Sequence, residues 1–149
     1  MKKLFATDDS VTAFILRLML GIVIFPHGAQ KLFGWFGGFG FSGTMGAFTE
    51  SMGIPSVVAF LVIIGESFGA IGLIAGFLTR FTAASLAVIM LGAIRLAHWQ
   101  HGFFMNWFGQ QKGEGFEFHL LFLAICAALM IMGGGKWSVD REISKRLAA

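Results

Sequence analysis

The sequence predicts an all-α fold: a polytopic membrane four-helix bundle with two outer loops and with both termini in the cytoplasm. Composition indicates a membrane protein, because 56% of the 149 residues are hydrophobic and only 13% are charged, against about 25% charged in an average soluble domain. The apolar residues form four continuous runs and do not alternate with polar ones, which favours helices over a transmembrane barrel. We expect one transmembrane domain, residues 1–149, without an internal repeat.

A helix that crosses a bilayer needs about 20 mostly apolar residues, each adding about 1.5 Å of length. The expected spans are, in chain order, residues 11–33, 54–78, 81–99 and 116–132. The first span follows two lysines and could be confused with a secretory signal peptide. We expect it to be retained, because two aspartates follow the lysines, Arg17 interrupts the run and no small-residue cleavage site precedes Pro26.

The second span contains four glycines at spacings of four, three and four residues. They are Gly65, Gly69, Gly72 and Gly76. This spacing places them on one helical face, where another helix can approach closely. We therefore expect the glycines to serve helix packing.

Topology follows from the distribution of lysine and arginine, which concentrate in cytoplasmic segments of membrane proteins. These residues cluster in both terminal segments and in the short turn at Arg80, whereas the long loops 34–53 and 100–115 contain only Lys112. The asymmetry predicts that both termini face the cytoplasm and both long loops face outward. Within the first loop, residues 41–52 fit either a short interfacial helix or a plain loop.

Several classes of function are excluded by composition. The net charge of +3 arises mainly from residues at the termini, so no nucleic-acid partner is expected. A single cysteine, Cys126, cannot form a disulfide scaffold, a thiol redox pair or an iron–sulfur cluster within this chain. No metal site is expected, because the nearest histidine pair, His98 and His101, lacks a usual zinc-ligand spacing.

Ionisable side chains inside a bilayer cost free energy, so each is a candidate for function. Counting along the spans places Glu66 about 18 Å and Arg95 about 21 Å from the cytoplasmic end. This match predicts an ion pair between the second and third spans, with either a catalytic or a structural role. Arg17 lies only about 9 Å deep, and we expect it to snorkel to the cytoplasmic headgroups. Its alternatives are to pair with Glu66 or to bind an anionic group.

Further polar residues gather at one depth in the outer half, reached from three spans. We expect His27, Lys31, His98 and Glu117 to line one cavity that opens toward the outer leaflet; His119 lies beside Glu117. The alternative is that each side chain turns separately to interfacial water. The candidate catalytic residues are Glu66, Arg95 and Glu117. The candidate cofactor-binding residues are His27, Lys31 and His98.

Quinone is the cofactor that this chemistry favours. Its two carbonyl groups need hydrogen-bond donors, its apolar tail would lie among the many phenylalanines, and imidazoles titrate near neutral pH. A b-type haem with His27 and His98 as axial ligands is a weaker alternative.

Several motifs resemble the DoxX family of small bacterial membrane proteins. They are His27-Gly28-Ala29-Gln30-Lys31-Leu32, Gly65-Glu66 with Gly69 and Gly72, Gly76-Phe77-Leu78-Thr79-Arg80, Glu117, and Gly133-Gly134-Gly135-Lys136-Trp137-Ser138-Val139-Asp140. The resemblance covers residues 16–140 and implies a four-helix inner-membrane protein associated with quinone-linked oxidoreductases. Relatives include a subunit of thiosulfate:quinone oxidoreductase, but sulfur transfer usually needs a reactive thiol, and Cys126 lies mid-span among apolar residues.

The sequence therefore predicts an inner-membrane subunit of a quinone-linked oxidoreductase, embedded in the lipid bilayer and working with a partner subunit that carries the electron donor. Two other classes stay open. One is a small transporter or permease in which Glu66, Arg95 and the histidines form a path. The other is a non-catalytic membrane scaffold for redox-stress proteins.

Overall fold

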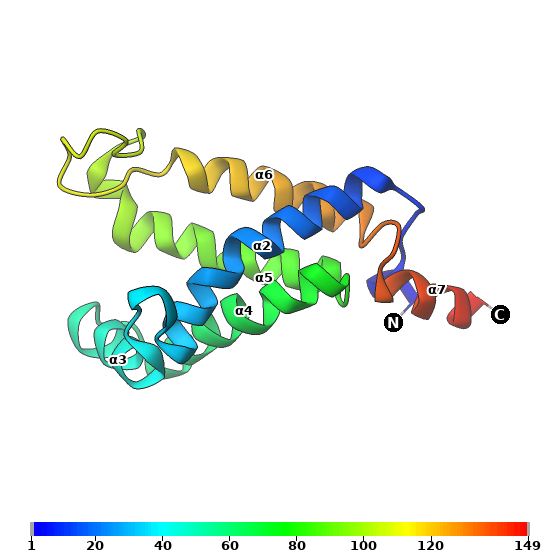
Figure 1. Ribbon diagram of the computed structural model, residues 1–149, viewed down its shortest axis with the longest axis horizontal. Helices are drawn as coiled ribbons and strands as arrows, with labels where there is room; N and C mark the ends of the chain where they lie inside the picture. The colour runs from blue at the N-terminus through cyan, green and yellow to red at the C-terminus, as the bar shows by residue number, and fades with distance from the viewer. Residues whose placement is uncertain (1, 149) are drawn as a thin grey trace.

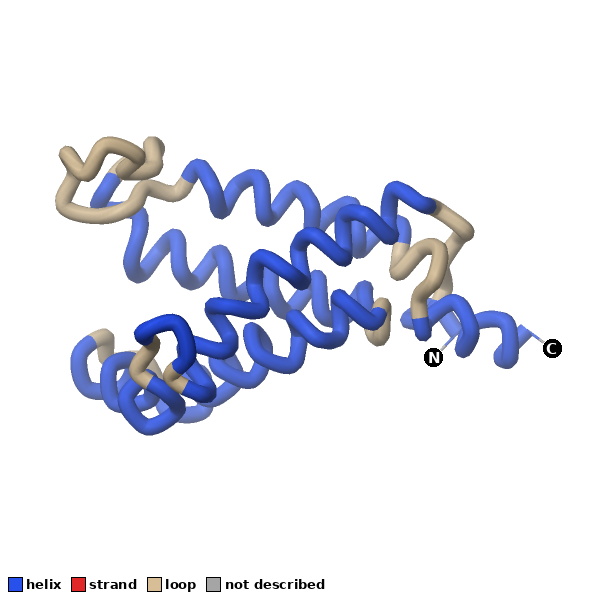
Figure 2. The backbone as a smooth tube through the Cα atoms, in the orientation of Figure 1, coloured by secondary structure: helices blue, strands red, loops and turns tan. Residues whose placement is uncertain are grey.

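Four long helices build the protein in the computed structural model, which describes residues 2–148 (Figure 1). They are α2 (Val11–Phe33), α4 (Ser56–Ala75), α5 (Thr79–Ala93) and α6 (Glu117–Met132). Helix α2 packs mainly on α4, and α5 packs mainly on α6. The described residues contain helices and turns but no strand (Figure 2), as the sequence predicts.

Short helices and turns connect the long helices or flank them near the two ends of the chain. They are α1 (Lys2–Phe5), the 3-10 turn η1 (Trp35–Gly37), α3 (Gly40–Gly46), the π-helical turns η2 (Ala47–Ser51) and η3 (Ile94–His98), the 3-10 turn η4 (Trp99–His101), and α7 (Val139–Ala148). Both termini lie at one end of the bundle, called here the terminal end, and both long loops lie at the other, the loop end (Figure 1). In the first loop, α3 and η2 confirm the short helix over a plain loop.

Three helices are long and apolar enough to span a membrane: Val11–Phe33, Ser56–Ala75 and the continuous stretch Thr79–His101. Helix α6 is apolar but has only 16 residues, about 24 Å of helix. It ends early because Gly133 turns the chain out of the helix with a φ of 80°. The predicted fourth span is thus a shorter helix lying beside α5 (Figure 1).

Glycines allow the closest helix contacts. A Cβ atom on Gly28 of α2 would lie 2.6 Å from the Cα atom of Ser67 in α4, so no larger residue fits without moving a backbone. In α4, added Cβ atoms on Gly65 and Gly69 would meet side chains of α5 at 2.8 and 3.2 Å. The predicted packing role is confirmed for Gly65 and Gly69, which face α5. Gly76 lies outside this helix face: it ends α4 with a φ of 69° and packs against Ser138 and Arg17.

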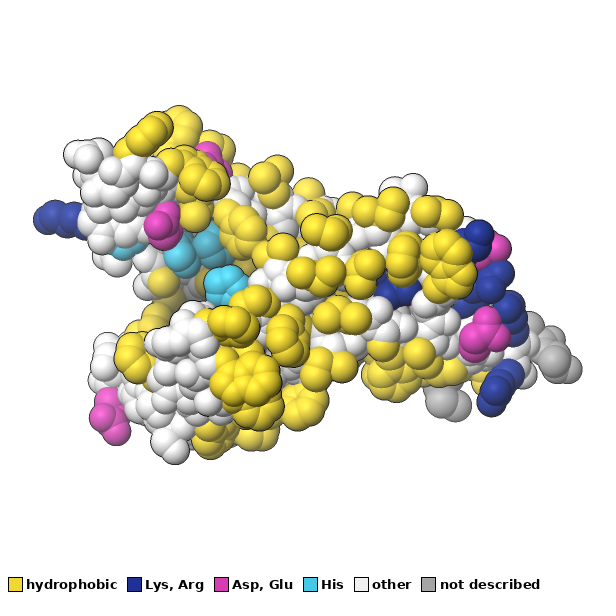
Figure 3. Space-filling model, in the orientation of Figure 1, with side chains coloured by type: hydrophobic (Ala, Val, Ile, Leu, Met, Phe, Trp, Pro, Cys, Tyr) yellow, Lys and Arg dark blue, Asp and Glu magenta, His cyan; other side chains and the backbone are white. Residues whose placement is uncertain are grey.

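The interior is mainly apolar, and so is the lateral surface, as a bilayer requires. Small and medium side chains such as Ala70, Leu73, Leu86 and Cys126 are fully buried where the helices meet. Large apolar side chains also cover the sides of the bundle, whereas most charges lie at its ends (Figure 3). Such a surface matches lipid tails along the bundle and polar headgroups at the ends.

Arg17 does not snorkel to the headgroups, contrary to the expectation from its depth. The residue is 1% exposed, and its guanidinium group donates hydrogen bonds to five backbone carbonyl oxygens. Two of them belong to Leu73 and Ile74 (3.0 and 2.5 Å), and the others belong to Gly134, Lys136 and Trp137 (2.8, 3.3 and 2.8 Å). The carbonyls in the last turn of a helix lack intrahelical partners, and the chain after α6 adds three more. Arg17 therefore joins the end of α4 to this returning segment, and it does not pair with Glu66.

The returning segment also binds the start of α5. The Asp140 carboxylate accepts hydrogen bonds from the backbone N–H groups of Leu78 and Thr79 at 2.7 and 2.8 Å. Arg80 donates to the carbonyl oxygens of Ala6 (2.9 Å) and Met130. Two sequence motifs, 76–80 and 133–140, thus form one hydrogen-bonded unit at the terminal end. This unit and Arg17 are together called here the terminal clasp.

Candidate functional site

A buried ion pair links α2 to α4 in the half of the bundle nearest the loop end. The Lys31 Nζ atom lies 2.6 Å from Glu66 Oε2, with the two side chains 21% and 6% exposed. The close crossing of α2 and α4 at Gly28 and Ser67 brings these residues together, because Lys31 lies three residues beyond Gly28 and Glu66 immediately precedes Ser67.

The predicted pair between Glu66 and Arg95 is therefore wrong. Arg95 is exposed on η3 and forms no ion pair or hydrogen bond within residues 2–148. Depth favoured Arg95, because Lys31 lies near the outer end of the first span, but the long lysine side chain on α2 reaches Glu66 from the end of its helix. The helix that packs closest to α4 supplies the partner.

Two histidines from different helices contact each other beside this pair. The ring centroids of His98 and His119 are 4.2 Å apart, with the ring planes inclined at 47°. His98 lies at the end of η3, and π-helical turns are frequent at functional sites. Its Nδ1 atom lies 2.9 Å from the carbonyl oxygen of Glu114 in the second loop. His119 is only 7% exposed, and its buried Nδ1 atom has no hydrogen-bond partner among the described residues.

His27 completes the group from α2. It lies close enough to His119, Lys31 and Glu66 to interact with them electrostatically, although its own side chain is largely exposed. At the loop end, α3 and the second loop stand apart. Figure 3 shows histidine side chains gathered in the hollow between them. His27, Lys31, Glu66, His98 and His119 are called here the polar cluster. Three predicted cofactor-binding residues and one predicted catalytic residue belong to it.

Glu117 lies outside the polar cluster, contrary to the expected cavity. Its carboxylate accepts hydrogen bonds from the Met105 backbone N–H at 3.1 Å and from the Trp107 indole N–H at 3.2 Å. The carboxylate of Glu114 similarly accepts from the backbone N–H of Asn106 at 2.7 Å. Both acidic residues thus order the second loop, whose backbone donors would otherwise be unsatisfied.

The residue of α6 that belongs to the site is His119, whereas the sequence predicts Glu117 there. The signal for this was present in the spacing of α6, where the buried residues Phe122, Cys126 and Leu129 follow His119 at intervals of three, four and three. This interval places His119 on the face that packs inside the bundle. Glu117, two residues earlier, falls on another face.

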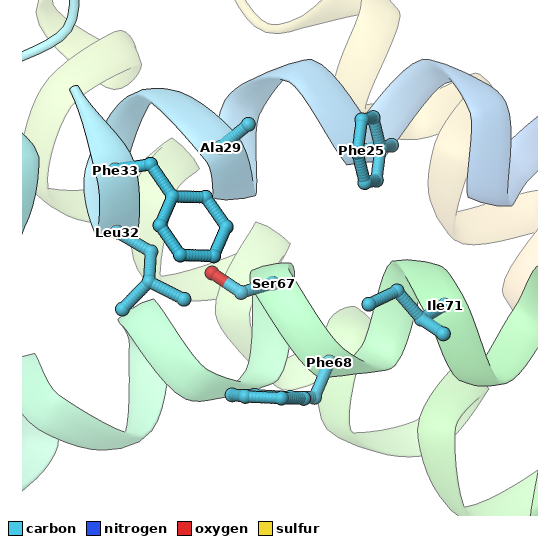
Figure 4. Close-up of a pocket in the computed structure, with 7 residues that line it drawn as sticks. All are labelled: Phe25, Ala29, Leu32, Phe33, Ser67, Phe68 and Ile71. Atoms are coloured by element: carbon cyan, nitrogen blue, oxygen red, sulfur yellow. The ribbon is translucent and has the colours of Figure 1, made fainter. Parts of the chain in front are cut away.

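No metal centre is indicated in the described part of the chain, where no group of three or more His, Cys, Asp or Glu side chains is arranged to hold an ion. Separately, an apolar pocket lies between α2 and α4 (Figure 4). Its lining residues are Phe25, Ala29, Leu32, Phe33, Ser67, Phe68 and Ile71. The hydroxyl group of Ser67 donates to the Gly28 carbonyl oxygen at 3.1 Å, so this pocket offers apolar contact and little chemistry. The polar cluster is the candidate functional site.

Comparisons with known proteins show which family the chain is similar to. The model of the DoxX family matches residues 12–99, which cover α2 from its second residue, α4, α5 and four residues of the polar cluster. The inner membrane protein YqjF of Escherichia coli is 30% identical over 146 residues, covering 98% of this chain and 99% of YqjF.

Two further relatives are more distant or cover less of the chain. The "Uncharacterized membrane protein Rv3486" of Mycobacterium tuberculosis is 29% identical over 99% of this chain and 90% of its own length. The "Putative oxidoreductase CatD" of Bacillus subtilis is 31% identical over 84 residues, 56% of this chain and 58% of CatD. No solved structure matches.

The family match covers more than half of the chain, the match to YqjF covers nearly all of it, and the helices are apolar enough for a bilayer. The chain is therefore a multi-pass bacterial inner-membrane protein and belongs to the DoxX family.

Proposed function

We propose that the polar cluster binds the headgroup of a quinone, and that the protein is the membrane subunit of a quinone-linked oxidoreductase. The observation that carries this proposal is the Lys31–Glu66 ion pair, 2.6 Å long and largely buried, beside three histidines from three helices. A charge pair and imidazoles at membrane depth are costly, and they are typical of ligand or proton sites in membrane proteins. A ligand that is soluble in the bilayer and carries a polar head fits such a site.

The donor groups of the cluster suit a quinone. A quinone has two carbonyl oxygens that accept hydrogen bonds, and it takes up two electrons and two protons when reduced. Lys31 Nζ and the imidazole N–H groups are donors, and the Nδ1 atom of His119 is buried without a partner. Lys31 and Glu66 bring no net charge into the bilayer, while Lys31 still orients a donor toward a bound carbonyl oxygen.

The electron donor would belong to a partner subunit. The 149-residue sequence has no dinucleotide-binding fingerprint and only one cysteine, so it offers no flavin, nicotinamide or iron–sulfur motif. The name of the Bacillus subtilis relative includes the word oxidoreductase, which favours redox function over transport for the segment that the two proteins share. The residues of the cluster would then bind and orient the quinone and exchange its protons.

Binding of decylubiquinone to the purified protein in lipid nanodiscs tests the proposal. Lys31→Met and Glu66→Gln should each weaken binding at least tenfold, because each removes one member of the pair. Arg95→Gln is the matched control, since Arg95 is a nearby but exposed cation without a partner, and it should change the affinity less than twofold. Wild-type protein that fails to bind, or cluster variants that bind normally, would overturn the proposal and favour transport or a scaffold role.

An optical spectrum of the same preparation tests the haem alternative. His98 contacts His119, which places a third imidazole close to both expected axial ligands and makes a haem between them less favourable. We expect no Soret band, together with quinone in the lipid extract. A Soret band in the wild type that is lost in both His27→Ala and His98→Ala would show that the polar cluster binds haem and would overturn the quinone proposal.

A further inference from the structure

The orphaned nitrogen of His119 is the one feature of the polar cluster that binding alone leaves without a defined role. The residue is 7% exposed and Nδ1 is buried without a partner. Leaving a buried polar atom unsatisfied costs about 1–3 kcal/mol. Such an atom is a place where another molecule can complete a hydrogen bond. Thr79 Oγ1 at the terminal end is also buried without a partner, but only His119 lies beside an ion pair and another imidazole. His119 is therefore placed to donate to, or accept from, a group that this chain does not supply.

His98 has a defined protonation geometry. A carbonyl oxygen only accepts hydrogen bonds, so the 2.9 Å contact with the Glu114 oxygen requires the proton to sit on His98 Nδ1. In the neutral ring the other nitrogen, Nε2, then carries a lone pair and accepts a proton. The ring contacts His119 on one side and the second loop on the other. That loop combines exposed aromatic side chains at 103–108 with the exposed polar residues Gln110, Gln111 and Lys112, and these polar residues lead to water.

The charged groups around His119 come from each neighbouring element. His98 of η3 and His27 of α2 act on it directly, and Lys31 and Glu66 act on His27. On its own helix, the carboxylate of Glu117 is held by Met105 and Trp107 of the second loop. The imidazoles of His119 and His98 are thus the titratable groups that connect the Lys31–Glu66 pair to the loop end.

We infer that His119 exchanges protons with the ligand of the polar cluster and that His98 passes them to water at the loop end. The inference rests on the proposed function, in which that ligand is a quinone or its hydroquinone. A proton from a ligand hydroxyl group moves to Nδ1 of His119, and the other nitrogen of the same ring releases its proton to Nε2 of His98. The doubly protonated His98 then gives one proton to water. One O–H bond is broken and one proton is delivered to water, with no net transfer of electrons on these side chains.

The first test is the pH dependence of binding. Decylubiquinol, kept reduced under anaerobic conditions, is titrated into wild-type protein in nanodiscs between pH 3.5 and 8.5. A protonated imidazole cannot accept the ligand hydroxyl, so the Kd of the wild type should rise, by up to tenfold per pH unit, once the pH falls below the pKa of His119. His119→Gln should flatten this dependence. His101→Gln, which alters the loop histidine outside the polar cluster, should keep it.

The second test addresses His98 as a positioning residue that acts through His119. After a stopped-flow pH jump in the buffer, bound decylubiquinol should reach its new level at least tenfold more slowly in His98→Gln than in the wild type or in His101→Gln. The equilibrium pH dependence should remain, because His119 is intact. An unchanged rate would overturn the role of His98.

The outcomes separate this inference from the proposed function. Wild-type protein that does not bind decylubiquinol at any pH would overturn the proposed function itself. Binding with the same pH dependence in His119→Gln would overturn only the proton role. If His119→Gln does not fold, NMR of wild-type protein with 15N-labelled histidine tests the inference instead. Decylubiquinol should shift one buried Nδ1 resonance, and unshifted resonances would overturn the inference.

Discussion

Replacing Arg17 with leucine should severely destabilise the protein, although the residue lies far from the candidate site. The substitution removes a charged donor that serves five carbonyl oxygens at 2.5–3.3 Å. One hydrogen bond to a charged group contributes about 1.5–3 kcal/mol, but five bonds to one group are not additive. Removing the donor leaves buried carbonyl oxygens unsatisfied, at about 1–3 kcal/mol each, and because some of them find other partners we expect a total loss of about 3–5 kcal/mol. For a chain of this size it corresponds to a fall in Tm of about 6–20 °C.

Thermal unfolding in nanodiscs, followed by circular dichroism, measures this loss. Arg17→Lys should recover part of the stability, because an ammonium group keeps the charge but has three donors in place of five. Arg95→Leu is the control, since Arg95 is exposed and unpaired within residues 2–148, and its Tm should change by little. If Arg17→Leu unfolds at the wild-type temperature, the terminal clasp does not stabilise the fold and the reasoning is refuted.

Three other substitutions or fusions test the remaining geometry. Gly28→Ala should destabilise by about 1–3 kcal/mol through overpacking at the α2–α4 crossing, whereas Gly92→Ala, which meets no neighbouring atom within 4 Å, should be neutral or stabilising in the same melt. Lys31→Met should cost about 3–5 kcal/mol because it leaves Glu66 unpaired, and adding Glu66→Leu should restore most of that loss; a double variant as unstable as the single one contradicts the pair. A reporter fused after Ala149 should be active only if it is a cytoplasmic type, and periplasmic activity would invert the topology.

The sequence predicted the helices well because long apolar runs determine membrane helices almost by length alone. Helix α2 begins and ends as predicted, and the start of α6 differs by one residue. Helix ends at glycines with left-handed backbone, such as Gly34 and Gly76 with φ of 74° and 69°, were placed within three residues. Helix α7 was missed because a short charged helix has no long apolar run, and its position depends on tertiary contacts such as the 2.8 Å pair of Arg141 with Asp9.

The pairing of polar groups was predicted poorly, because the depth of a residue along a helix does not indicate which way its side chain faces around the helix axis. Glu66 and Arg95 match in depth, yet only the close approach at Gly28 decides that Lys31 is the partner. Arg17 looked like a snorkelling side chain because the carbonyl oxygens that bind it come from residues 73–74 and 134–137, which the linear sequence does not bring together. For the polar residues, the sequence indicates which face of a helix is buried only in α6. There the spacing of the buried residues identifies His119 as an inward-facing side chain.

The two ends of the bundle differ in what happens to their buried charged and titratable side chains, and this difference indicates where function lies. At the terminal end, Arg17 and Asp140 are each 1% exposed and are engaged with backbone groups, so these two charged side chains have little left to offer a ligand. At the loop end, His119 is nearly as buried but keeps an unsatisfied nitrogen beside an ion pair and two further imidazoles. Each end thus has one buried side-chain atom without a hydrogen-bond partner among the described residues, Thr79 Oγ1 at the terminal end and His119 Nδ1 at the loop end. Only the atom at the loop end belongs to a group that can exchange a proton near neutral pH, and only there do an ion pair and further imidazoles lie beside it. This combination makes the loop end the place to look for the ligand.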